Sequence, residues 1–163
     1  SFSTLGNAMS SYTAQNTGAR KLFRIPEGLK AGIVMLIVVS LPFFVAYFVF
    51  PNTMMNIFVK SSEAGIIDVG RIFLKIVTPF YFVISAKLTF DGILRGAGRM
   101  RAFMASTFTD LFLRVILAYV FSYALNSEVG IWLSWPVGWT IAVVISAVFY
   151  FIYYKTTIKN GAN

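Results

Sequence analysis

Residues 87–101 read KLTFDGILRGAGRMR, and they mark the point where one long apolar segment ends and another begins. The run places Lys87, Asp91 and Arg95 at intervals of four residues. Side chains at this spacing lie one above the other on a helix. The following Gly-Ala-Gly and its flanking arginines then interrupt the pattern. The stretch therefore predicts a charged helix end, a tight turn and a second helix.

The composition outside this stretch is that of a membrane protein. The chain has 163 residues, of which 58% are hydrophobic and 12% are charged, and its mean hydropathy is +0.75. A soluble domain has about 45–50% apolar and about 25% charged residues. The chain contains no Cys and no His, which excludes disulfides, thiol catalysis and most transition-metal sites. It also lacks a phosphate-binding glycine loop and a nucleophile–base pair, so we expect no enzyme.

Four apolar segments have about the 20 residues that a helix needs to cross a bilayer. They cover residues of about 31–50, 66–94, 102–125 and 131–154. Backbone polar groups in lipid must be satisfied within each segment, which favours helices over strands. We therefore expect an all-α membrane protein, a polytopic helical bundle in contact with the lipid bilayer.

Residues 1–19 are small and polar, with small side chains at every fourth position: Gly6, Ser10, Ala14 and Gly18. On a helix these positions form one stripe, which lets a neighbouring helix approach closely. We interpret the segment as the end of a fifth, buried helix that starts before Ser1. A polar surface helix and a disordered leader are the alternatives. A loop at 20–30 and a tail at 155–163 complete the expected organisation.

The basic residues alternate between connectors. Nine of the 14 lie in residues 20–30, in 95–101 and in the tail, whereas the connectors at 51–65 and 126–130 hold only Lys60. Lys and Arg are enriched in the cytoplasmic loops of membrane proteins. We therefore predict a multi-pass protein of the cell membrane with a cytoplasmic C-terminus. Topology accounts for the net charge of +8, so we expect no nucleic acid partner.

Ionisable groups inside a span each cost about 2.5–3.5 kcal/mol at its centre, so they are candidates for function. The second span has one polar face, predicted to line a cavity, which consists of Asp68, Arg71, Lys75, Thr78, Ser85 and Thr89. Lys87 and Asp91 lie almost opposite this face. Pro79 predicts a kink, because proline lacks the backbone N–H that the helix needs. A static bend and a moving hinge both remain open.

Asp91 is an anchor if it pairs with Lys87 or Arg95, and an ion or proton site if it faces a cavity. Asp68 is the second candidate for such a site. In the third span, Asp110 and Arg114 have the spacing of a helical ion pair. We favour a structural role for that pair, joining the third span to the charged end of the second.

Three stretches resemble the multidrug and toxic compound extrusion (MATE) family. They are LGNAMSSYTAQNTGARK at 5–21, FDGILRGAGRMRAFMASTFTDLFLRV at 90–115 and EVGIWLSWPVGW at 128–139. The resemblance implies twelve helices in two six-helix lobes, of which this chain holds part of the eighth and the ninth to twelfth. The N-lobe and the seventh helix would be missing partners within the same protein.

The resemblance also implies antiport, in which drugs or other organic cations leave as Na⁺ or H⁺ enters, with no other cofactor. An acidic residue of the tenth helix commonly belongs to the cation site in this family, which implicates Asp91 and Asp68. Two positions depart from the family pattern. Lys87 stands where an apolar residue or Gln is usual, and Arg99 stands where Asp is frequent.

For the turn, we expect Gly96 and Gly98 to permit a tight cytoplasmic connection. Its arginines would contact anionic headgroups, and ion pairs with Asp91 and Asp110 would steady the helix ends. Two alternative functions remain open. A lipid-linked oligosaccharide flippase of related architecture would use the cations Arg71, Lys75 and Lys87, and a non-transporting membrane subunit would need no such charges.

Overall fold

The computed structural model describes residues 2–58 and 64–159, which form helices without a β-strand in those ranges. The helices are α1 (Phe2–Gly18), α2 (Arg24–Phe44), α3 (Pro51–Phe58), α4 (Ala64–Val77), α5 (Tyr81–Gly96), α6 (Met100–Leu125) and α7 (Val129–Tyr153). Short turns of other helical types are η1 (Val45–Val49) after α2, η2 (Thr78–Phe80) between α4 and α5, and η3 (Tyr154–Ile158) after α7. The expected all-α bundle is confirmed.

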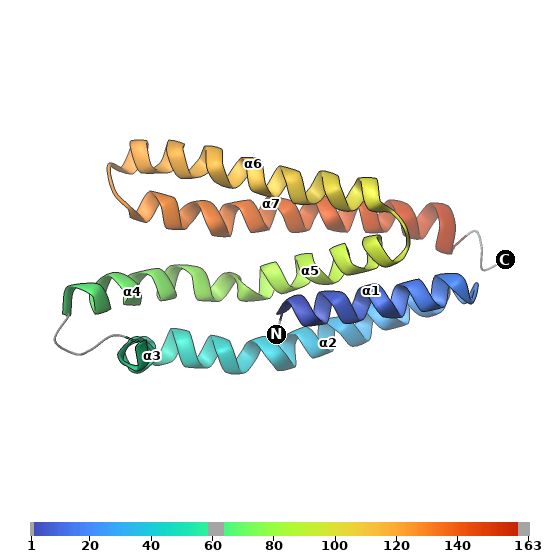
Figure 1. Ribbon diagram of the computed structural model, residues 1–163, viewed down its shortest axis with the longest axis horizontal. Coiled ribbons are helices and arrows are strands. Elements are labelled where there is room, and N and C mark those ends of the chain that lie inside the picture. Colours follow the sequence, from blue (N-terminus) through green and yellow to red (C-terminus); the bar gives the residue numbers. More distant parts are fainter. Residues whose placement is uncertain (1, 59–63, 160–163) are drawn as a thin grey trace.

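The long helices lie along one axis, as Figure 1 shows. α6 and α7 form an antiparallel hairpin, and α4 and α5 run between this hairpin and α2. α1 packs against both α5 and α2. Within the part of the chain that the structure describes, three helical segments are long and apolar enough to cross a membrane: Arg24–Val49, Met100–Leu125 and Val129–Ile158.

The segment predicted as one span at 66–94 is divided. α4 ends at Val77, a 3₁₀ turn follows, and α5 begins at Tyr81. Pro79 lies in that turn. Proline has no backbone N–H to donate, and its ring clashes with the carbonyl four residues earlier in a regular helix, which explains the interruption. This segment is therefore absent from the spans that qualify by length and composition within the described residues.

α1 and α5 approach closely through glycine. A side-chain carbon on Gly92 would overlap the carbonyl oxygen of Gly6, and one on Gly96 would overlap that of Ser10. Small residues at helix contacts permit this approach. The predicted stripe of α1 thus meets its neighbour at Gly6 and Ser10, whereas Ala14 and Gly18 are exposed.

Gly98 alone of the two predicted turn glycines makes the α5–α6 turn. Its φ of 71° lies in the left-handed region. The Arg99 N–H bonds the Leu94 carbonyl at 2.8 Å, and the Gly98 N–H bonds the Arg95 carbonyl at 3.1 Å. These two bonds form a Schellman cap, whose left-handed position favours glycine. The expectation that Gly96 serves the turn is corrected, because it serves the contact with α1.

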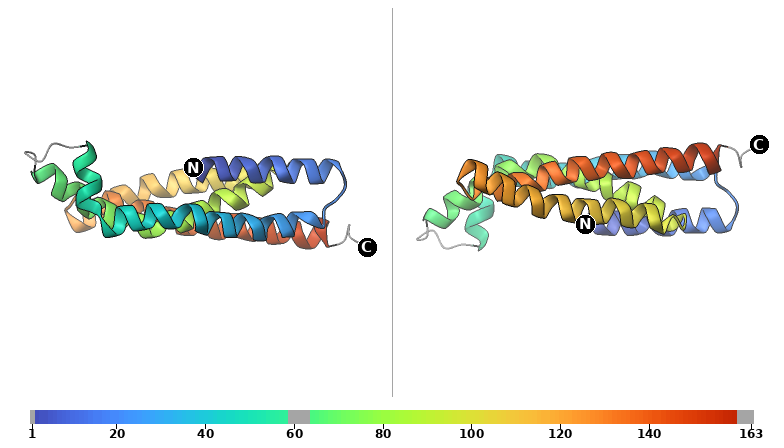
Figure 2. Two further views of the ribbon diagram at one scale, coloured as in Figure 1. Left: turned by 90° about the horizontal axis from the view of Figure 1, so that it is seen from below. Right: turned by 90° about the horizontal axis from the view of Figure 1, so that it is seen from above.

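The three basic connectors lie at one end of the bundle. The α1–α2 turn, the α5–α6 turn and the end of α7 gather there, while the connections from α2 to α4 and from α6 to α7 lie at the other end (Figures 1 and 2). This is the arrangement that the alternation of charge requires. The tail predicted at 155–163 begins as the helical turn η3. Residues 160–163 and Lys60 lie outside the described residues.

Candidate functional site

Lys87 and Asp91 form a buried ion pair on α5. Lys87 Nζ lies 2.6 Å from Asp91 Oδ2, and each side chain is 5% exposed. Their spacing of one helical turn brings them together. Desolvation of two charges costs several kcal/mol per ion, and mutual attraction offsets that cost only when the geometry is good.

Two serines extend the pair to the neighbouring helices. Ser146 Oγ of α7 donates to Asp91 Oδ1 at 2.5 Å, and Ser106 Oγ of α6 lies 2.5 Å from Ser146 Oγ. Both serines are buried. We call Lys87, Asp91, Ser106 and Ser146 the Asp91 cluster. Both carboxylate oxygens of Asp91 are bonded, and the cluster joins α5, α6 and α7.

The other polar face of α5 contacts α2. Ser85 Oγ lies 3.3 Å from Ser40 Oγ and donates to the Tyr81 carbonyl at 2.6 Å, while Thr89 donates to the Ser85 carbonyl at 2.9 Å. Ser85, Thr89 and Thr78 of the adjoining turn are all buried. We predicted that these residues line a cavity, but Ser85 and Thr89 are packed between helices in this structure.

Asp68, Arg71 and Lys75 lie on α4, beyond Pro79 from the Asp91 cluster. Asp68 Oδ1 is 3.1 Å from Arg71 Nη2, and their side chains are 63% and 41% exposed. Lys75 is also exposed. An exposed pair of this kind contributes little to stability. The structure does not bring these residues together with Asp91.

Asp110 and Arg114 pair within α6 and face α7. Arg114 Nη2 lies 2.6 Å from Asp110 Oδ2, and the guanidinium carbon lies 5.5 Å from the centre of the Trp135 ring. A side-chain carbon on Gly138 would lie 3.3 Å from Asp110 Oδ1. That oxygen has no hydrogen-bond partner among the described residues. The expectation that this pair joins α6 to the second span is corrected, because these contacts reach α7.

Arg95 does not pair with Asp91. Its Nη2 bonds Asn7 Oδ1 at 2.8 Å, and its Nε bonds Ser10 Oγ at 3.3 Å. Lys87 and Ser146 already bond the two carboxylate oxygens of Asp91. The Arg95 guanidinium bonds Asn7 and Ser10 of α1 instead. Arg95 therefore ties α5 to α1, and the predicted Asp91–Arg95 ion pair is wrong.

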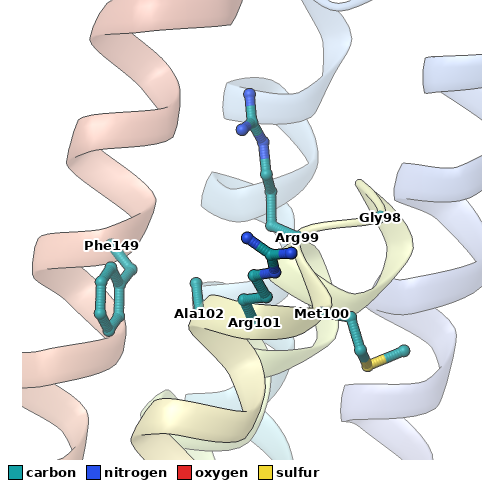
Figure 3. Close-up of a pocket in the computed structure, with 6 residues that line it drawn as sticks. All are labelled: Gly98, Arg99, Met100, Arg101, Ala102 and Phe149. Carbon is teal, nitrogen blue, oxygen red and sulfur yellow. The ribbon is translucent and has the colours of Figure 1, made fainter.

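A separate cavity of about 620 Å³ opens beside the α5–α6 turn. It is lined by Gly98, Arg99, Met100, Arg101, Ala102 and Phe149, and Figure 3 shows Phe149 projecting from its helix toward the start of α6. The Arg99 guanidinium bonds Thr157 Oγ1 at 2.9 Å and covers the Tyr153 ring. Arg99 thus holds the turn against the end of α7.

Sequence reasoning missed Ser106 and Ser146. A signal was present for Ser146, because small residues recur at every fourth position along α7: Gly130, Ser134, Gly138, Ala142 and Ser146. All five are buried. Such a stripe indicates close helix packing, but it does not indicate which partner the serine meets.

The comparisons with known proteins identify the family. No curated protein matches the chain. A sequence model of the MatE family matches residues 2–120, which include the stretches at 5–21 and 90–115 on which the resemblance rests. The third stretch, at 128–139, lies beyond the matched range. The chain therefore belongs to the MatE family of membrane transporters, as the resemblance of its sequence predicted.

Proposed function

We propose that this chain is part of a secondary active transporter that exports drugs or organic cations across the cell membrane by alternating access. Entry of Na⁺ or H⁺ drives the export. The observation that carries this proposal is the match of residues 2–120 to the MatE family. The buried ion pair between Lys87 and Asp91 is the candidate exchange site: it anchors α5 in this structure, and opening the pair would free Asp91 for a cation. Ionisable groups within membrane helices are costly, and where they persist they mark ion pathways and proton relays.

The pair has the chemistry of an exchange site. Asp91 keeps a negative charge in a buried place because Lys87 supplies the neutralising positive charge. When a cation binds Asp91 Oδ2, Lys87 can release a proton to solvent and become a neutral amine. The site then keeps its net charge while one cation replaces another.

The position of the pair suits a conformational cycle. Asp91 bonds α7 through Ser146, and α7 bonds α6 through Ser106. Pro79, between α4 and α5, supplies a hinge candidate outside the cluster. In secondary transporters, movement of helix bundles around a central site alternates its access. Exchange at Asp91 would alter the contacts between α5 and the α6–α7 hairpin.

The alternative of an oligosaccharide flippase has less support. A pyrophosphate would need several uncompensated cations, whereas Lys87 is paired with Asp91 and Arg71 with Asp68. Of the three cations that this alternative would use, that leaves the exposed Lys75. A non-transporting subunit would have no need of a buried charged pair, which costs stability. We therefore retain cation-coupled export as the proposed function.

The test uses the complete transporter in proteoliposomes with an imposed Na⁺ or pH gradient and a fluorescent organic cation. We expect Asp91→Asn to abolish gradient-driven export, because the neutral amide cannot exchange a cation. Asp91→Asn leaves Lys87 unpaired, so a double variant with Lys87→Met as well removes both charges and preserves packing. The matched control is the double variant of the other helical pair, Asp110→Asn with Arg114→Met, and Asp68→Asn tests the second candidate separately. Normal coupled export by the folded double variant would exclude this site.

A further inference from the structure

The two serines of the Asp91 cluster form a continuous hydrogen-bonded path. Ser146 Oγ lies 2.5 Å from Asp91 Oδ1 and 2.5 Å from Ser106 Oγ, and Ser106 Oγ lies 3.4 Å from the Ala142 carbonyl. Both serine residues are 0% exposed. The short distance to Asp91 is typical of a hydroxyl that donates to an ionised carboxylate.

The direction of each bond follows from proton counting. A serine hydroxyl carries one proton and can accept from others. Ser146 donates its proton to Asp91, so Ser106 must be the donor between the two serines. Each donor strengthens the next in a buried chain. The path therefore directs two successive hydroxyl dipoles toward Asp91 Oδ1.

We propose that Ser146 and Ser106 are positioning residues for cation exchange at Asp91. They hold Oδ1 and keep the carboxylate ionised, so that Oδ2 faces the exchanging partner, Lys87 or a bound cation. Hydrogen bonds to a charged carboxylate favour that charged form. This inference rests on the proposed function, and it assigns a role to two residues that carry no charge of their own.

Other ionisable groups lie on every helix packed around Asp91. They are Tyr12 on α1, Arg24, Glu27 and Lys30 on α2, Tyr81 and Arg95 on α5, Arg101, Asp110, Arg114, Tyr119 and Tyr123 on α6, Tyr150 and Tyr153 on α7, and Tyr154 in η3. Arg95 bonds Asn7 and Ser10, and Asp110 bonds Arg114. Within the described residues, Lys87 is the group that forms an ion pair with Asp91. The hydrogen bond from Ser146, which Ser106 supports, is therefore the other interaction that stabilises the charged form of Asp91.

The position of Ser106 links this control to helix packing. Asp91, Ser146 and Ser106 belong to α5, α7 and α6, respectively. A shift of α6 relative to α7 would break the bond between the serines and weaken the donor that reaches Asp91. The affinity of the site for a proton would then rise. Exchange at Asp91 and the packing of the hairpin are therefore coupled in both directions.

The experiment measures gradient-driven export of a fluorescent organic cation by the complete transporter as a function of pH. Loss of a donor to the carboxylate disfavours its ionised form, so the Lys87–Asp91 pair releases its proton at higher pH. We expect Ser146→Ala to move the midpoint upward by about one pH unit, a tenfold change in proton affinity. Ser106→Ala moves it in the same direction by less, and Ser146→Thr, which keeps the hydroxyl, restores it.

Ser134→Ala is the matched control. Ser134 is buried on the same helix, but its hydroxyl donates to the Ile131 carbonyl of that helix at 2.6 Å. The pH midpoint of export by the Ser134→Ala variant should equal that of the parent. With Na⁺ as the driving ion, Ser146→Ala should also raise the half-saturating Na⁺ concentration at fixed pH, because protons compete more strongly.

Two outcomes separate this inference from the function on which it rests. If Asp91→Asn abolishes coupling while Ser146→Ala keeps the parental midpoint, the serine path is overturned and the proposed function stands. A uniform loss of export with an unchanged midpoint also overturns it, because that result indicates packing alone. If Asp91→Asn exports normally, both fail.

Discussion

Removal of either partner of the Lys87–Asp91 ion pair should strongly lower the stability of the bundle. Each side chain is 5% exposed, so solvent does not screen the charge that remains. Removing one member of a buried pair costs about 3–5 kcal/mol, because the other stays buried and uncompensated. We therefore expect Lys87→Met alone, and Asp91→Asn alone, each to destabilise the protein by about that amount.

The double variant should behave differently. With both charges replaced by neutral side chains of similar size, no buried charge is left, and the change in stability should be close to zero. The amide oxygen that Asp91→Asn introduces can still accept the hydrogen bond from Ser146. Because each single change costs about 3–5 kcal/mol and the double change about zero, the coupling between the two sites should be about 6–10 kcal/mol.

The assay is a double-mutant cycle on the complete protein in detergent, with unfolding followed by denaturant or heat. Asp110→Asn in combination with Arg114→Met gives a parallel cycle on a pair of which the Arg114 side chain is 29% exposed, and its coupling should be smaller. Single variants of Lys87 and Asp91 that unfold like the parent would refute the reasoning. They would indicate that water reaches the pair.

Three further predictions concern packing, the turn and the exposed pair. Gly92→Ala should lower stability by about 1–3 kcal/mol, since the added carbon overlaps the Gly6 carbonyl, and thermal unfolding that matches the parent would contradict the close contact. Gly98→Ala should cost about 1–2 kcal/mol because φ is 71° there, and an unchanged denaturant midpoint would argue against the left-handed cap. Asp68→Asn should change stability by less than about 1 kcal/mol, and a larger loss in the same unfolding assay would indicate a buried partner.

Lys87, Asp91 and Arg95 show what the sequence alone can predict of the site. Spacing alone predicts that Asp91 can pair with Lys87 or with Arg95, because both lie one turn away. The choice depends on tertiary contacts, since Asn7 and Ser10 of α1 bond Arg95. Those residues lie more than 80 positions away in the chain, and no local pattern connects them to Arg95.

The hydrogen bonds of Ser146 and Ser106 also depend on tertiary contacts that the sequence does not show. Serine is common in membrane helices, where it packs closely or bonds its own backbone. Ser134 does the latter, and Ser146 reaches Asp91 instead. The two differ in which helix lies opposite, and only the assembled bundle determines this. Hydropathy alone predicts residues 66–94 as a single span. The structure interrupts it at Pro79, where the sequence predicts a kink.

The family and the helical class, in contrast, are readable from the sequence. Long apolar segments and alternating basic connectors require helices across a bilayer. The motif at 90–115 includes the turn that Gly98 forms and the start of α6, and it lies within the region matched by the MatE family.

Proton release measures exchange at Asp91 most directly. A fluorescent organic cation or Na⁺ is added to the purified complete transporter in weakly buffered detergent solution, and the change in pH is recorded. The account predicts that the parent and the Asp110→Asn, Arg114→Met control release protons as the cation binds, whereas the folded double variant with Lys87→Met and Asp91→Asn releases none. Equal proton release from the double variant and the parent would contradict it.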